Sequence, residues 1–236
     1  IITATAGTSN FRAGVNAGNS IESGGNYNVV VGDEAGTAIT TGDNNTAVGY
    51  NAGTAVTTGT SNTAIGFKSL DANTTASNNT AIGKSALGSN TDGDSNTAVG
   101  FSTLASNTTG ANNVAVGRES LGNNTTASNN TALGYAALLT NTTAINNTAV
   151  GSESLTANTS GAQNTAVGVS SMKATTTGGD NTALGFNSLV VNTTGTGNTA
   201  LGRSTLDANT TASNNTAVGS NALGANTTGA SNTATG

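Results

Sequence analysis

The chain of 236 residues contains no cysteine, histidine, proline or tryptophan and a single methionine. Without imidazole or thiol groups it lacks the common general base, the common nucleophile and the usual zinc ligands. Charged residues make up 7% of the chain, against about 25% in an ordinary domain. Its six Lys and Arg residues are dispersed, which argues against a basic patch for nucleic acid. No apolar run approaches the roughly 20 residues that cross a bilayer. We therefore expect no enzyme, catalytic residue, cofactor, metal site, nucleic-acid partner or membrane insertion.

What the chain does contain is a strict 17-residue repeat. The pentapeptide Asn-Thr-Ala-Val-Gly, or a close variant, opens each copy, at Asn28, Asn45, Asn62, Asn79, Asn96, Asn113, Asn130, Asn147, Asn164, Asn181, Asn198, Asn215 and Asn232. We number repeat positions 1 to 17 from this Asn. A degenerate copy starts at Asn10, one residue out of step. The sequence thus predicts a lead-in over residues 1–27 and tandem repeats over residues 28–236, as an excerpt of a longer fibre.

The length of the repeat predicts the fold. Helical repeats need about 30 residues or more, and Asn, Thr and Gly are poor residues for helix interiors. Heptads and the Gly-Pro pattern of collagen are both absent. We therefore expect an all-β, parallel β-solenoid (β-roll) of about 13 coils with 17 residues per coil, each coil holding two or three short strands. The lack of proline agrees, because a ladder between coils uses every backbone N–H.

The composition of each repeat position predicts which residues lie inside. Position 4 is aliphatic, as in Val48 and Ile65, and position 9 is almost always Leu, so both are predicted to face the core. Strand alternation then turns the Ala of position 3 outward, where it would suit close packing against another chain. The invariant Gly of position 5 predicts a corner with positive φ or close approach, and the Asn residues predict hydrogen-bonded ladders at the corners.

The repeat also resembles known families. Blocks such as Val-Ala-Val-Gly and Thr-Ala-Ile-Gly between small polar corners resemble the head repeats of trimeric autotransporter adhesins of the YadA type. The longer Leu-x-x-Asn-Thr-Thr-Gly-x-Asn-Asn-Thr-Ala-Val-Gly unit resembles repeats of bacteriophage tail fibres. This resemblance covers residues 28–236. It implies a homotrimer that is extracellular, on a cell surface or on a virion. It also implies a structural or adhesive fibre segment that presents a region binding a cell-surface receptor or glycan.

Position 6 holds most of the aromatic residues and several cations. Its candidate surface-binding or stacking stripe consists of Tyr50, Phe67, Lys84, Phe101, Arg118, Tyr135, Phe186 and Arg203. Neighbours in this stripe lie one coil apart, close enough for cation–π contacts. The stripe predicts either a site for sugars or surfaces, or a ladder that stabilises the stacking of coils.

Two other functions fit parts of the pattern. The Thr residues at positions 13 and 14 form regular columns on a weakly charged solenoid, which is typical of ice-binding proteins, although spaced Thr-x-Thr pairs would be a stronger signal. A self-assembling extracellular filament subunit is a further alternative. Asp92-Gly93-Asp94 resembles a fragment of a calcium loop, but it occurs in one repeat and is interpreted as a solvated corner.

Overall fold

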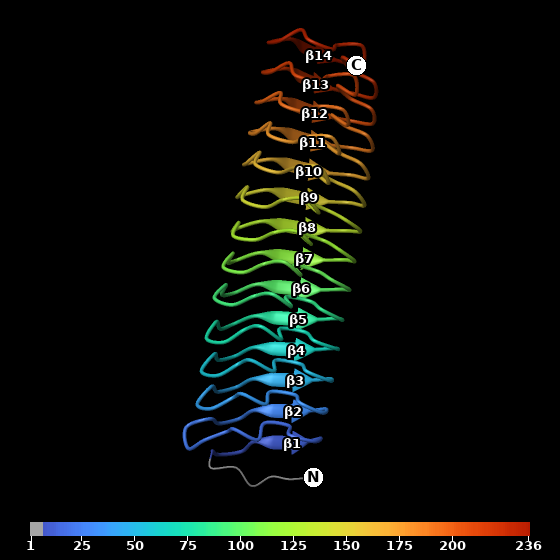
Figure 1. Cartoon of the computed structure of the whole chain (residues 1–236). Coiled ribbons are helices and arrows are strands. Elements are labelled where there is room, and N and C mark those ends of the chain that lie inside the picture. The colour runs from blue at the N-terminus through green and yellow to red at the C-terminus, as the bar shows by residue number, and fades with distance from the viewer. Residues whose placement is uncertain (1–6) are drawn as a thin grey trace. The chain divides into compact units, whose positions relative to one another are not determined.

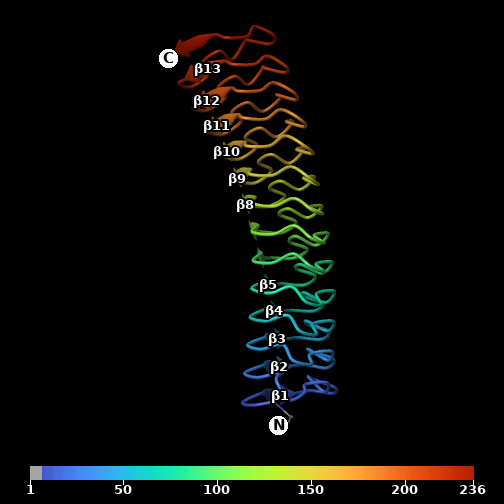
Figure 2. The same cartoon turned by 90° about the vertical axis from the view of Figure 1, so that its left-hand side faces the viewer.

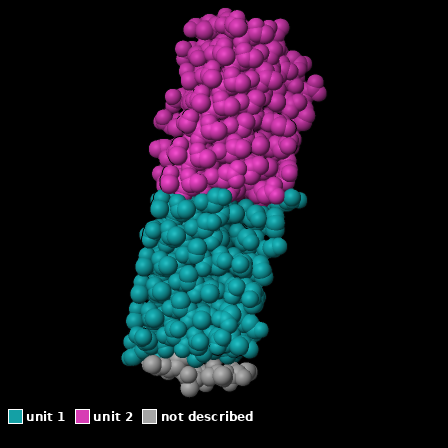
Figure 3. Space-filling view, in the orientation of Figure 1, with its two compact units in different colours: residues 1–118 teal, residues 119–236 magenta. Residues whose placement is uncertain are grey.

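The computed structural model describes residues 7–236 and divides the chain into two compact units, which meet in sequence between Arg118 and Glu119 (Figure 3). The first six residues of the predicted lead-in lie outside the described part. No helix among the described residues is long and apolar enough to cross a membrane. Both units have the same internal organisation.

Within the described residues 7–236, each unit contains seven strands of three residues (Figure 1). Those of the first unit are β1 (Phe11–Ala13), β2 (Val29–Val31), β3 (Thr46–Val48), β4 (Thr63–Ile65), β5 (Thr80–Ile82), β6 (Thr97–Val99) and β7 (Val114–Val116). Those of the second are β8 (Thr131–Leu133), β9 (Thr148–Val150), β10 (Thr165–Val167), β11 (Thr182–Leu184), β12 (Thr199–Leu201), β13 (Thr216–Val218) and β14 (Thr233–Thr235).

Within each unit, consecutive strands pair in parallel and in register, so that each residue lies beside its equivalent in the next repeat. Thr63 pairs with Thr80 in the first unit, for example, and Ala166 pairs with Ala183 in the second. Strand β1 pairs with β2, Phe11 with Val29, through a coil that is one residue longer than the others, which matches the offset of the degenerate copy. The coils that these strands belong to are seen edge-on in Figure 2. This arrangement confirms the predicted all-β parallel solenoid with one coil per 17-residue repeat.

Each coil contains one strand, whereas two or three were predicted. After the glycine corner the chain leaves the extended conformation, because residues at positions 7 and 9 adopt left-handed backbone angles, such as φ 52° at both Lys68 and Leu70. The amides still bond along the stack, and Leu70 N donates to Ala86 O at 2.9 Å. Placing Leu in this conformation costs about 1–2 kcal/mol. The complete burial of these leucines offsets that cost.

The invariant glycine of position 5 is required for two reasons. Gly83 has φ +132°, a conformation that L side chains rarely adopt. In addition, a Cβ at Gly83 would lie 2.4 Å from the carbonyl oxygen of Gly100 in the next coil. The glycines therefore form a column in which each backbone closely approaches the next, as the sequence predicted.

The apolar core lies between position 3 and position 9. The leucines of position 9 are fully buried, from Leu70 to Leu206, which confirms their predicted place. The alanines of position 3 face them and are also fully buried, from Ala81 to Ala217, so the prediction that they point outward was wrong. The coil is narrow, and the strand can place only a small side chain opposite the large Leu.

The first repeats show the same space filled in another way. Position 9 is Gly36 there, and position 12 is Ile39 in place of the later Asn. A Cβ on Gly36 would lie 2.6 Å from Val30 Cγ1 and 2.8 Å from Ile39 Cδ1. The side chains of Val30 and Ile39 therefore occupy the volume that Leu takes in later coils, where Ala stands at position 3.

Two ladders of buried asparagine complete the interior. At position 1, the backbone N–H of Asn62 donates to Asn45 Oδ1 at 3.0 Å, while Asn62 Nδ2 donates to Ala76 O at 2.9 Å. At position 12, Asn107 Nδ2 donates to Asn90 Oδ1 at 2.8 Å and to Gly110 O at 2.9 Å. The ladders that the sequence predicted at the corners are thus present, and they pair most of the amide groups that the thin coil buries.

Candidate functional site

The outer face of the strands carries an uninterrupted row of aliphatic side chains in each unit, which we call the aliphatic column. It consists of position 4: Val31, Val48, Ile65, Ile82, Val99 and Val116 in the first unit, and Leu133, Val150, Val167, Leu184, Leu201 and Val218 in the second. Position 2 of the same strands, usually Thr, faces the same way. From β2 onward, positions 2 to 4 hold no charged residue.

The sequence placed the aliphatic column in the core, and this prediction was wrong. The side chain of Ile65 is 37% exposed and that of Leu201 is 44% exposed, whereas Ala64 and Ala200 beside them are buried. Strand alternation correctly separates positions 3 and 4 onto opposite faces, but it does not decide which face is interior. Large side chains thus lie outside because the space inside is already filled by Leu.

The aromatic–cation stripe of position 6 lies on the surface beside the glycine corner. In the first unit the structure brings its members together into one row. Tyr50 and Phe67 stack with ring centroids 5.7 Å apart and an interplanar angle of 19°. Lys84 Nζ lies 5.7 Å from the ring centroids of both Phe67 and Phe101. Arg118 Cζ then lies 5.8 Å from the centroid of Phe101.

The stripe is less regular in the second unit. Tyr135 and Phe186 are exposed, by 47% and 52%, but Ser152 and Val169 occupy the two intervening coils. Phe186 and Arg203 occupy neighbouring coils. The predicted stripe residues therefore form a continuous row over Tyr50 to Arg118, and within the second unit Ser152 and Val169 separate Tyr135 from Phe186.

The contacts of the row from Tyr50 to Arg118 distinguish between a sugar-binding site and a ladder that stabilises the stacking of coils. A sugar that stacks on an aromatic residue needs a free ring face. In the row, Phe67 lies between Tyr50 and Lys84, and Phe101 lies between Lys84 and Arg118, so neighbouring side chains take up the ring faces. Phe67 and Phe101 are each 44% exposed. The occupied ring faces favour a ladder that stabilises the stacking of coils, with each cation–π contact worth about 0.5–1 kcal/mol at an exposed site.

The threonine columns differ in what their hydroxyl groups do. At position 13 the hydroxyl bonds along the stack: Thr57 Oγ1 donates to Thr74 O at 3.0 Å, and Thr193 Oγ1 donates to Thr210 O at 3.0 Å. At position 14 the side chains are exposed, as at Thr75 and Thr194. The column at position 13 therefore serves the ladder, and its hydroxyl groups are not free to order water at the surface.

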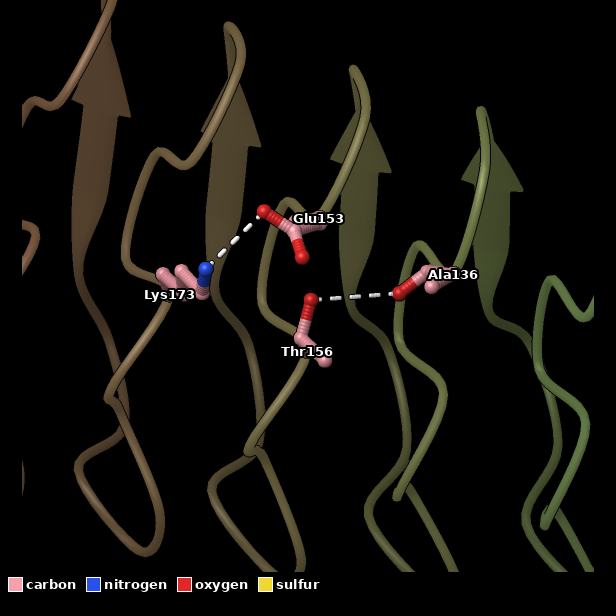
Figure 4. Close-up of polar contacts among 4 residues, drawn as sticks. All are labelled: Ala136, Glu153, Thr156 and Lys173. Carbon is pink, nitrogen blue, oxygen red and sulfur yellow. Dashed lines mark hydrogen bonds and ion pairs between the residues drawn. The ribbon is translucent and has the colours of Figure 1, made fainter.

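Charged side chains make isolated contacts at the surface. Lys173 Nζ pairs with Glu153 Oε2 at 2.9 Å across adjacent coils, and Thr156 Oγ1 donates to the carbonyl oxygen of Ala136 at 3.2 Å (Figure 4). Both charged side chains are more than a third exposed, so this pair contributes at most about 1 kcal/mol. Burial raises the pKa of Asp71, opposed by its own backbone hydrogen bond and by the charge of Lys68.

The acidic corner at Asp92 and Asp94 has a structural use. Asp94 Oδ1 accepts the backbone N–H of Ser77 in the preceding coil at 2.6 Å. Asp43 accepts the N–H of Asn26 in the same way, at 2.7 Å. Within residues 7–236, no group of three or more acidic residues is gathered as a metal would require. The carboxylates of Asp94 and Asp43 therefore act as caps for N–H groups.

Comparison of the chain with protein-family models and with curated proteins finds no match.

Proposed function

We propose that the chain is a non-catalytic segment of an extracellular fibre, of the tail-fibre or surface-adhesin type. It would lie on a virion or a cell surface and would hold a region that binds a receptor or glycan away from the body that carries it. The aliphatic column carries this proposal. An apolar surface that continues over successive coils is unusual for a protein that remains alone in water, and such patches mark interfaces.

A second copy of the chain is the partner that best fits the column. The apolar side chains recur once per coil, so only a partner with the same axial repeat can cover every one of them. Rotational symmetry gives each copy the same environment. In a homotrimer, three columns would meet along one axis and leave the polar corners in water. The contact between chains would thus be made by the aliphatic column, and not by the alanines of position 3 that the sequence suggested.

Such a segment would act mechanically. Backbone bonds, glycine corners and asparagine ladders join each coil to the next, so added coils add length without a new core. Outside the aliphatic column, the surface is largely neutral and polar, with Thr, Ser and Asn at the exposed corners. This composition limits nonspecific adhesion along the shaft and leaves specific binding to the presented region.

The test is the mass of the protein in solution, measured by sedimentation equilibrium. The wild type is expected to be a trimer, and Leu184→Asp with Leu201→Asp is expected to give monomers, because six charges would meet at the seam. Thr194→Asp with Thr211→Asp is the matched control, since these side chains are exposed on another face and Asp92 occupies the same repeat position naturally. A monomeric wild type, or a trimer that survives the first pair of changes, would refute the proposal.

Ice binding is a second candidate. The observation that favours it is the outer face of the strands, and not the Thr columns at positions 13 and 14. Thr at position 2 and an aliphatic residue at position 4 face outward two residues apart, as in Thr182 and Leu184, and repeat with every coil. This is a regular, uncharged array of hydroxyl and methyl groups. Thermal hysteresis of the purified protein tests it, and an absence of hysteresis would end this candidate. Long fibres in electron micrographs, in place of discrete oligomers, would instead favour a filament subunit.

A further inference from the structure

The asparagine ladder of position 12 is interrupted once in the second unit. Asn141 Nδ2 donates to Asn124 Oδ1 at 3.0 Å, and Asn158 Nδ2 donates to Asn141 Oδ1 at 3.0 Å. The next residue of the ladder is Thr175, after which asparagine returns at Asn192. The ladder therefore lacks one carboxamide between Asn158 and Asn192.

This interruption leaves polar atoms buried without partners in the protein. Asn158 Oδ1 and Thr175 Oγ1 make no hydrogen bond there, and both residues are 0% exposed. Asn192, also 0% exposed, keeps the bond from Nδ2 to Gly195 O at 3.1 Å. The carboxamide oxygen that would accept its second N–H is missing at Thr175. The acceptor, the hydroxyl group and the N–H group thus belong to three successive coils, with Thr175 in the middle one.

Threonine cannot close the ladder by itself. Its hydroxyl group stands one bond nearer the backbone than the amide of asparagine, so Thr175 stops short of the place from which an amide nitrogen would reach Asn158 Oδ1. The same coil departs from the repeat a second time, since position 9 is Met172 in place of Leu. Methionine is unbranched and adapts to irregular space in a core. Two buried positions of this coil thus differ from the repeat, while the backbone bond from Met172 N to Ser188 O is kept at 2.9 Å.

We propose that one water molecule is bound inside this coil, between Asn158 Oδ1 and Thr175 Oγ1. It would donate to the Asn158 oxygen and accept from the hydroxyl group of Thr175, with the N–H of Asn192 as a further donor nearby. Internal waters typically bind where two to four buried polar groups converge, and buried polar groups in proteins are almost always paired. A metal cation fits poorly, because two neutral oxygens and an N–H do not form its coordination shell.

The proposal predicts that the water can be removed or duplicated by single substitutions. Thr175→Asn restores the carboxamide, and it should expel the water and join the two parts of the ladder. Asn141→Thr makes the same interruption between Asn124 and Asn158, and it should create a second water site. Circular dichroism of both variants shows whether the solenoid is retained.

Magnetic relaxation dispersion of the solvent counts internal waters of long residence, and a crystal structure locates them. Relative to the wild type, the count is expected to fall by one in Thr175→Asn and to rise by one in Asn141→Thr. The melting temperature of Thr175→Asn should rise by about 2–4 °C. An equal count in the wild type and Thr175→Asn would overturn the proposal. So would electron density in which the Thr175 hydroxyl and Asn158 Oδ1 bond to protein atoms alone. If Asn141→Thr fails to fold, Thr175→Asn alone decides.

Discussion

Leu184 and Leu189 allow a direct test of which face of the strand is the interior. They lie five residues apart in the same coil, and the same substitution, Leu→Ala, can be made at each. Leu189 is fully buried, and Leu184 is 36% exposed. Leu189 has φ 54°, but alanine there would keep the same backbone angle, so the comparison measures packing.

The two substitutions should lower the free energy of unfolding by clearly different amounts. Removing the buried side-chain atoms of leucine loses about 2.4 kcal/mol of transfer free energy, and the cavity at Leu189 raises the total cost to about 3–5 kcal/mol. At Leu184 only about two thirds of that transfer term applies and no closed cavity forms, so the cost in a single chain is about 1.5 kcal/mol.

Urea unfolding followed by circular dichroism measures both costs. The protein should be dilute enough to be dissociated, because association would add to the cost at Leu184. Hydrogen exchange of the Leu189 amide, which donates to Thr205 O at 2.9 Å, reports the local loss if the repeats unfold in more than one step. A loss at Leu184 equal to or larger than that at Leu189 in the dissociated chain would refute the assignment of the two faces.

Three further changes test the corner, the stripe and a surface carboxyl group. Gly151→Ala places a Cβ 2.5 Å from Gly168 O at φ +133°, so the urea midpoint should fall by an amount equivalent to about 3 kcal/mol or more; a wild-type midpoint would contradict the close approach. Phe101→Ser removes contacts with two cations and should cost about 1–2 kcal/mol in thermal melting, while an unchanged melting temperature would indicate that the stripe does not stabilise the stack. Because burial raises the pKa of Asp71, its protonated form favours folding, and that contribution is lost as the pH rises through the raised pKa. Asp71→Asn should therefore melt above the wild type at pH 7 but not at pH 3, and the reverse order would contradict the direction of the shift.

The sequence correctly predicted the parts of the fold that the 17-residue repeat determines. A repeat of constant length, without insertion, requires equivalent residues to stack, so the parallel register follows directly. The glycine corner follows from an invariant residue without a side chain, and the Leu wall follows from a large apolar residue at a fixed position. The asparagine ladders were predicted from the chemistry of stacked amides. All these features depend on contacts between equivalent residues of neighbouring repeats.

The two faces of the strand could not be predicted in the same way. Alternation is symmetrical, and the common rule that large aliphatic residues lie inside favoured position 4. The interior is decided by volume, because Leu fills the coil and leaves space only for Ala opposite. One signal was available in the sequence: Gly36 and Gly53 occupy position 9 in early repeats, whereas Leu70 and its successors occupy it later. In the repeat where Gly36 replaces Leu, Val30 replaces Ala at position 3 and fills the same volume, which indicates that position 3 faces the interior.

The sequence identified the residues of the candidate stripe, but it did not decide between a binding site and a stabilising ladder. The aromatic and cationic residues of position 6 were identified, and their contacts in the first unit follow from the spacing of coils. That neighbouring side chains take up the ring faces of Phe67 and Phe101 depends on ring orientation, which the sequence does not encode. The aliphatic column was missed as a surface because it was assigned to the core.

The asparagine ladders also have a consequence for how such a gene can change. Each ladder bond joins one residue to its equivalent in the adjacent repeat, and most coils offer the same donors and acceptors to the next. Unequal recombination between repeats in the coding sequence would therefore remove or insert a whole coil and leave every ladder closed across the junction. The number of coils can then vary by inheritance in steps of one repeat. An insertion of another length is tolerated only where the ladder bond is kept, as in the 18-residue coil across which the backbone N–H of Asn28 still donates to Asn10 Oδ1 at 2.8 Å.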